Sequence, residues 1–389
     1  MNRSRSRRVG FASAVLLLAM LGAACGDDEP SSATVEEIDG GGDDASGSAS
    51  ASGSASASAS APAEGSEGGA VEATAGDGGY EYASDVSAHR LVVADICEIG
   101  DQLPTDGEID WDVVDAWYRD GGNSVNSDGS VRTIGGFASR EDRNPALQEY
   151  YGSSTPLDDF VTEALTGTGA FDGEPDLVRR QGVAKGIQDQ VMVAWVIHEL
   201  ETAMGKAAEG DFDAAGGAPH NWDEAWAFYH GSEPGCSPFA TANSRGANFG
   251  TLGAGETALA NEAILAAMIE GRDALLDEDA EGAQAAADEV IRNAVITYSQ
   301  ATVRYSALMT DDLAEDDAET ARIHQAEGFA FWRVIEAAVA GAGADIDAIN
   351  GILDLANEPS SGAEPIVREA LAPAWDALGI AADDIGELQ

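Results

Sequence analysis

From about residue 80 to the C-terminus, apolar side chains recur at helical spacing, and no strand-like alternation of useful length interrupts them. Periodicity of this kind predicts amphipathic helices that bury one face against each other. We therefore expect an all-α fold, a helical bundle. The expected helices are residues 88–97, 111–118, 156–166, 174–206, 220–230, 254–277, 281–309, 315–341, 344–356 and 363–378.

An internal similarity predicts how the bundle is organised. Residues 224–229 (EAWAFY) and 327–332 (EGFAFW) share a glutamate, a small residue, an aromatic residue, Ala, Phe and a second aromatic residue, and an amphipathic segment precedes each. We predict two pseudo-repeated helical units from this match, with a chance match in a biased composition as the alternative. The units are residues 81–250, which include a loop insertion, and residues 251–389.

The first 25 residues have the pattern of an export signal. Four arginines precede the apolar run 11–21, and Gly22-Ala-Ala-Cys25 follows it. This arrangement resembles a bacterial lipoprotein signal peptide, in which cleavage before Cys25 leaves that cysteine lipid-modified. We expect an exported protein that is lipid-anchored to the outer face of the bacterial cell membrane. Residues 26–80 are mostly Gly, Ser, Ala, Asp and Glu, a composition that predicts a disordered tether.

Charge and cysteine content narrow the function classes further. With 70 acidic and 20 basic residues, the formal charge is −50, which excludes nucleic-acid binding because phosphate would be repelled. The acidic surface suits either strong hydration or the attraction of cations.

If Cys25 is lipidated, Cys97 and Cys236 are the two cysteines that remain. In an exported protein such a pair favours one disulfide, and two buried free thiols are the alternative.

Histidines and carboxylates recur together at helical spacing, so that both side chains share a helix face. Imidazole nitrogens and carboxylate oxygens bind iron, zinc and manganese, and helical bundles often build such sites from Glu and Glu-x-x-His pairs. We predict a metal site drawn from this set. Surface ion pairs, helix caps and core hydrogen bonds are the alternative roles. The candidate ligands are His198, Glu201, His220, Asp223, Glu224, His230, His324 and Glu327.

Three stretches resemble the low-iron-inducible periplasmic protein family, the iron-assimilating proteins of green algae and their bacterial relatives. They are residues 117–124 (WYRDGGNS), 186–200 (GIQDQVMVAWVIHEL) and 217–231 (GAPHNWDEAWAFYHG), of which the last is the most specific. The resemblance covers about residues 85–380. It implies an exported protein that binds iron outside the cell, but it supplies no ligand set. The segment 198–201 (HELE) is similar, more weakly, to the His-x-x-Glu motif of imelysin-like proteins.

We therefore predict a membrane-anchored lipoprotein, not an enzyme, that binds iron and passes it to an iron transporter. Zinc and manganese are the alternative metals. A metal-free helical scaffold or adhesion module is one alternative function, favoured by the acidic surface and the tether. A metallohydrolase of imelysin type is another, with Glu199 or Glu201 as the base. The sequence contains no His-Glu-x-x-His or Gly-x-Ser-x-Gly motif that would support hydrolysis.

Overall fold

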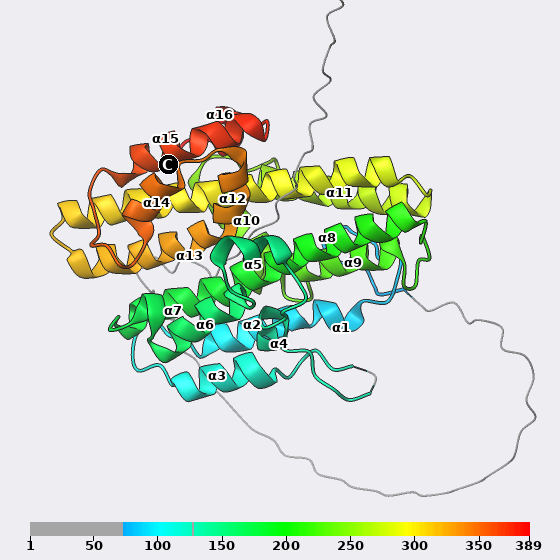
Figure 1. Cartoon of the computed structure of the whole chain (residues 1–389), viewed down its shortest axis with the longest axis horizontal. Helices are drawn as coiled ribbons and strands as arrows, with labels where there is room; N and C mark the ends of the chain where they lie inside the picture. Colours follow the sequence, from blue (N-terminus) through cyan, green and yellow to red (C-terminus); the bar gives the residue numbers. More distant parts are fainter. Residues whose placement is uncertain (1–72, 127) are drawn as a thin grey trace, which may run out of the picture. The chain divides into compact units, whose positions relative to one another are not determined.

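Figure 1 shows the computed structural model, which describes residues 73–389 except residue 127. Within this part of the chain the regular structure is helical, and only isolated β-bridges occur in the loops. The all-α class is therefore confirmed. The signal peptide, Cys25 and the tether up to residue 72 lie outside the described residues.

The helices that surround the candidate site are α1 (Ser87–Arg90), α8 (Met192–Glu209) and α9 (Ala218–Tyr229). The other α-helices are α2 (Val92–Asp101), α3 (Trp111–Asp120), α4 (Ile134–Ala138), α5 (Pro145–Tyr151), α6 (Pro156–Thr166), α7 (Asp176–Lys185), α10 (Pro238–Asn248), α11 (Leu259–Leu276), α12 (Ala280–Ala314), α13 (Ala318–Ala342), α14 (Ile346–Leu353), α15 (Ala363–Ala377) and α16 (Ala382–Ile385). Three short elements, η1 (Gly169–Phe171), η2 (Gly186–Val191) and η3 (Pro234–Cys236), complete the chain.

Acidic residues begin four of the helices. The side chains of Asp110, Asp279, Asp317 and Asp345 each accept a hydrogen bond from the backbone N–H three residues further on. A carboxylate at this position satisfies an unpaired donor and interacts favourably with the helix dipole. Part of the excess of acidic residues therefore defines where helices start.

The helix expected over residues 174–206 has two parts. Helix α7 and helix α8 are joined by η2, a π-helical segment whose six residues are all buried. A π-turn inserts an extra residue and rotates the apolar stripe of the following helix, which a fixed helical period does not reveal. Helix α10 was not among the expected helices, although its position between two of them leaves the overall class unchanged.

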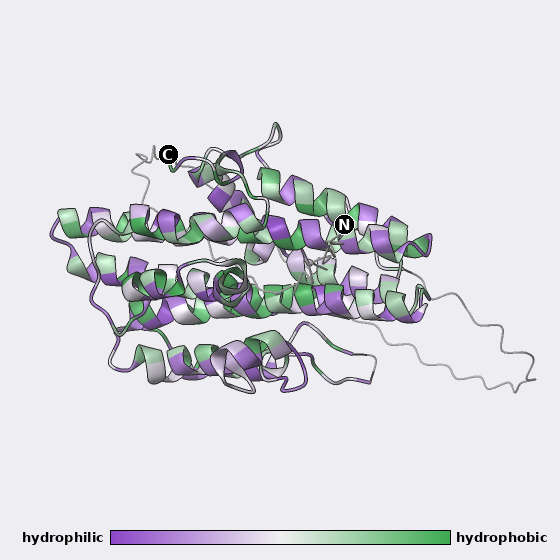
Figure 2. Ribbon diagram, turned by 45° about the horizontal axis from the view of Figure 1, so that its top comes forward, coloured by the Kyte–Doolittle hydropathy of each residue, from purple (hydrophilic) through white to green (hydrophobic). Residues whose placement is uncertain are grey.

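Consecutive helices form the core. Helix α8 packs along α9, and α12 packs along both α11 and α13, as Figure 1 also shows. In Figure 2, apolar and polar residues are interleaved along these helices, as expected for amphipathic elements. Helix α9 is fixed against α11 by Trp222, whose Nε1 donates to the Met268 carbonyl over 2.8 Å. A Cβ at Gly271 would lie 1.9 Å from the Trp222 ring, so this contact requires glycine.

The described residues belong to one compact unit. The two pseudo-repeated units stay a prediction. No helix in residues 73–389, residue 127 aside, combines the length and the apolar character needed to cross a membrane.

Candidate functional site

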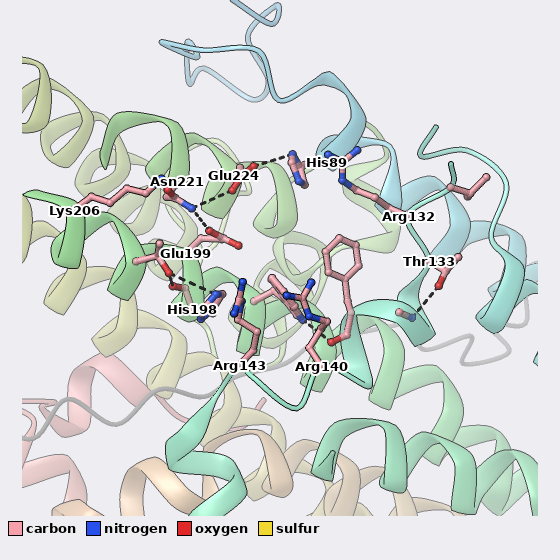
Figure 3. Close-up of a pocket in the computed structure, with 15 residues that line it drawn as sticks. His89, Arg132, Thr133, Arg140, Arg143, His198, Glu199, Lys206, Asn221 and Glu224 are labelled. Atoms are coloured by element: carbon pink, nitrogen blue, oxygen red, sulfur yellow. Dashed lines mark hydrogen bonds and ion pairs between the residues drawn. The ribbon is translucent and has the colours of Figure 1, made fainter. Parts of the chain in front are cut away.

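A pocket of about 690 Å³ is lined by residues of α1, α8 and α9 and of the segment 131–143 (Figure 3). Its polar lining includes both acidic and basic groups. The lining residues are His89, Val131, Arg132, Thr133, Gly136, Phe137, Arg140, Arg143, Trp195, His198, Glu199, Thr202, Lys206, Asn221 and Glu224.

Glu224, which lines this pocket, is the centre of a hydrogen-bonded cluster. Its Oε1 lies 3.1 Å from His89 Nδ1 and 3.2 Å from His220 Nε2. Its Oε2 accepts a hydrogen bond of 3.2 Å from Asn221 Nδ2, which also donates to Glu199 Oε2. His220 and Glu224 meet because residues four apart on a helix share a face. Two carboxylates and two imidazoles therefore come together from α1, α8 and α9.

The two carboxyl groups of the cluster, Glu199 and Glu224, differ in pKa. Burial and the neighbouring Glu224 carboxylate raise the pKa of Glu199 to about 8. Burial alone would raise the pKa of Glu224, but hydrogen bonding from His220 and the two nearby imidazoles lower it. At neutral pH Glu224 is therefore ionised and Glu199 keeps its proton, so the pair carries one negative charge.

The two imidazoles also differ. Burial lowers the pKa of His89 to about 4, so this ring is neutral at physiological pH. The hydrogen bond to Glu224 raises the pKa of His220 above its ordinary value. The cluster thus contains a neutral imidazole, His89, and a second imidazole, His220, which readily carries a proton beside the Glu224 carboxylate.

Basic side chains also line the pocket. Arg140 and Arg143 lie side by side and form what we call the cationic wall, while Arg132 lies near His89 and Lys206 lies beside Asn221 (Figure 3). Arg140 and Arg143 both pair with Asp142, over 2.9 Å and 2.6 Å. The buried Nη1 of Arg132 has no hydrogen-bond partner among the described residues. In a chain with a net charge of −50, these basic groups are concentrated at one pocket, where they would attract an anion.

His198 lines the same pocket beside the cationic wall. Its ring centroid is 5.1 Å from that of Trp195, and the Thr202 hydroxyl contacts its Nε2 over 3.5 Å. Burial, with the nearby Arg143 and Arg140 charges, lowers the pKa of His198 to about 4. The ring is therefore neutral and is a further nitrogen donor on this side of the pocket.

Asp223, next to Glu224 in sequence, has a different environment. Its Oδ1 accepts from the Tyr80 hydroxyl over 2.7 Å, and its Oδ2 accepts from the backbone N–H groups of Ala83 and Ser84 over 2.8 Å and 2.7 Å. These contacts tie the N-terminal segment to α9.

The other predicted ligands lie apart from the pocket. Glu327 on α13 forms a buried ion pair with Lys185, with 3.2 Å between Oε1 and Nζ. His324 pairs with Asp312 over 2.6 Å. His230 stacks on Trp226, and Glu201 is exposed on α8. The structure thus brings together His198, His220 and Glu224 from the predicted set.

Sequence reasoning missed His89, Asn221 and the cationic wall. Spacing along one helix identifies contacts between neighbouring turns, but His89 reaches Glu224 from a distant segment. The arginines come from residues 131–143, which we expected to be mainly loop. Glu199 was considered only as the base of a hydrolase.

Cys97 and Cys236 form a disulfide with a Cα–Cα distance of 5.4 Å. It connects α2, which follows the site helix α1, to η3, which follows the site helix α9. The bond therefore restrains two of the segments that supply the Glu224 cluster.

Across residues 73–126 and 128–389, no three His, Cys, Asp or Glu side chains already surround a common point suited to a metal ion. The chain matches the low iron-inducible periplasmic protein family over residues 61–389. No curated protein and no solved structure matches it.

Proposed function

Because the chain belongs to the low iron-inducible periplasmic protein family, we propose that it binds iron outside the cytoplasm and delivers it to an iron transporter. The family is periplasmic and is induced by low iron, so the protein is exported and its role is consistent with iron acquisition. We further propose that Cys25 carries the lipid anchor, which would keep the bound iron near the membrane. In this proposal iron is cargo, and the protein is a binding protein and not an enzyme.

The single observation that carries the proposal is the arrangement of donor atoms around Glu224. Its Oε1 lies 3.1 Å from His89 Nδ1 and 3.2 Å from His220 Nε2. Neighbouring ligand atoms of an octahedral ion with bonds of about 2.1 Å are separated by about 3 Å. Each imidazole nitrogen thus lies at the distance from Glu224 Oε1 that two neighbouring ligands of one ion have, and small rotations would direct the three groups at a common ion. Imidazole nitrogen and carboxylate oxygen suit iron, with zinc and manganese as competitors.

The remaining groups of the pocket suit an ion that is bound together with an anion. Glu199 would become a further oxygen ligand once it loses its proton. Arg132, Arg140 and Arg143 face the same space, and guanidinium groups bind carboxylates and other oxyanions through charge-assisted hydrogen bonds. A pocket of about 690 Å³ is also larger than a bare ion needs. We therefore propose ferric iron with an anionic co-ligand as the cargo.

The test is an iron titration of the full mature chain without a histidine tag, using ferric nitrilotriacetate as the iron source. We expect one iron per chain and a loss of affinity of about 100-fold or more in Glu224→Gln. The matched control is Glu201→Gln, which makes the same change on the exposed side of α8 and should bind iron as the wild type does. Absence of iron binding, or equal binding by Glu224→Gln, would overturn the proposal. Titrations with zinc, manganese and calcium establish selectivity.

A further inference from the structure

Asp223 fastens the segment that follows the tether to the site helix α9. The carboxylate is fully buried. Its Oδ1 accepts from the Tyr80 hydroxyl over 2.7 Å. Its Oδ2 accepts from the Ala83 N–H over 2.8 Å and from the N–H and hydroxyl of Ser84, each over 2.7 Å. Four hydrogen bonds thus hold residues 80–84 in one position.

The Ser84 hydroxyl extends this network to the site. Two backbone N–H groups, which can only donate, already point at Asp223 Oδ2, so this oxygen is an acceptor and Ser84 gives it its single hydroxyl hydrogen. The Ser84 oxygen also lies 3.0 Å from His220 Nδ1. Having donated its hydrogen, it accepts the hydrogen of Nδ1. The other ring nitrogen, Nε2, then faces Glu224 Oε1 at 3.2 Å.

We propose that Ser84, held by Asp223, is a positioning residue of the iron site, which orients His220 so that Nε2 is presented to the ion. This inference rests on the proposed function. Histidines that bind metals commonly donate their second ring N–H to a fixed acceptor, which selects the tautomer and the ring orientation. Here the acceptor comes from the N-terminal segment, which continues into α1 and His89. Ser84 and His89 are therefore the two residues of this segment that serve the site.

Loss of the acceptor has a specific consequence for the ring. If the imidazole of His220 turns over about its Cβ–Cγ bond, Nδ1 exchanges places with Cδ2 and Nε2 with Cε1. A carbon atom would then face Glu224, and the ion would lose a ligand although the backbone is unchanged. Ser84 prevents this rotation because only the observed ring orientation places the Nδ1–H group of His220 against the serine oxygen.

The first experiment measures the affinity of the full mature chain for iron, supplied as ferric nitrilotriacetate. Ser84→Ala should bind iron about 10–100-fold more weakly than the wild type. Ser84→Thr, which keeps the hydroxyl, should restore binding to within about threefold. The matched control is Tyr80→Phe, which removes another hydrogen bond to the same Asp223 but leaves the contact between Ser84 and His220. It should bind iron as the wild type does.

The second experiment reads the ring directly in the protein loaded with gallium(III), a diamagnetic substitute for ferric iron. Two-bond ¹H–¹⁵N spectra should show His220 with its hydrogen on Nδ1 and none on Nε2, where the ion has replaced it, assigned by the signal lost in His220→Gln. Ser84→Ala should lose this single pattern, and Tyr80→Phe should keep it.

The outcomes separate the two proposals. If Glu224→Gln abolishes iron binding while Ser84→Ala binds as the wild type does, the positioning role is overturned and the proposed function stands. Equal weakening by Ser84→Ala and Tyr80→Phe would show that only the attachment of the segment matters, which also overturns the positioning role. If Glu224→Gln binds normally, the proposed function itself fails.

Discussion

The buried pair of Lys185 and Glu327 provides a test of whether Glu224, and not Glu327, is a ligand in the proposed iron site. Lys185 Nζ lies 3.2 Å from Glu327 Oε1, and the side chains are 2% and 8% exposed. Glu327 has the same place in its aromatic run as Glu224, but its partner is an ammonium group. We expect Glu327→Gln to destabilise the protein and to leave iron binding unchanged, the opposite of Glu224→Gln.

The structure sets the size of the effect. Two unit charges separated by 3.2 Å attract by about 5 kcal/mol at an effective dielectric constant of about 20. Removing one partner of a buried pair typically costs about 3–5 kcal/mol, since the other charge stays in a poorly solvated position. Glutamine has nearly the volume of glutamate, so loss of packing adds little. Replacing both partners, as in Lys185→Met with Glu327→Gln, removes both charges, and the loss in free energy of unfolding should be less than the sum of the two single losses.

The assay is urea unfolding of the wild type, the two single variants and the double variant, followed by far-ultraviolet circular dichroism. A coupling energy of about 2 kcal/mol or more is expected from this double-mutant cycle. Losses that add to within about 0.5 kcal/mol would refute the reasoning. It would also be refuted if Glu327→Gln unfolded like the wild type but bound iron more weakly, because Glu327 would then be a ligand.

Two further predictions concern the disulfide and Glu199. Reduction of the bond between Cys97 and Cys236 should lower the free energy of unfolding by about 5 kcal/mol, a value from the chain-entropy relation for a separation of 139 residues. The urea midpoint, measured with and without reductant, checks this prediction. Equal midpoints would contradict it. Burial and Glu224 raise the pKa of Glu199 from 4.5 to about 8, so the metal-free folded state retains a proton that the unfolded state releases, and stability should fall as pH rises between these values. Glu199→Gln should reduce this slope in urea unfolding at several pH values; an unchanged slope would assign the dependence to other groups.

The helices were predictable from sequence because the residues that specify a helix lie within it or at its ends. Apolar residues at helical spacing, acidic caps such as Asp279 and Asp317, and glycine at helix ends specify helices without reference to the rest of the chain. The π-helical segment η2 was not predictable in this way, since it breaks the period. Its polar residues are buried in the core, where a local pattern would have placed a continuous apolar stripe.

The residues of the site were predictable only where they lie close together in the sequence. His220 and Glu224 lie one turn apart on α9, and their spacing identified them. His89, Arg132 and Ser84 reach the same place from earlier segments, and nothing in the spacing of α9 indicates them. The pairing of residues across the bundle is set by tertiary packing, which one sequence does not display.

Glu224 and Glu327 show why similar motifs need not have similar chemistry. Each is a buried carboxylate on the second helix of a consecutive pair, and burial of such a charge requires a compensating group. For Glu327 that group is Lys185, an ammonium that belongs to the chain and does not leave. For Glu224 it is two imidazoles, which can stop donating hydrogen to the carboxylate and bind a cation through nitrogen. A carboxylate of the first kind contributes to stability, and one of the second kind has partners suited to the metal binding that we propose. The difference therefore lies in the partners, which come from elsewhere in the chain, and not in the motif itself.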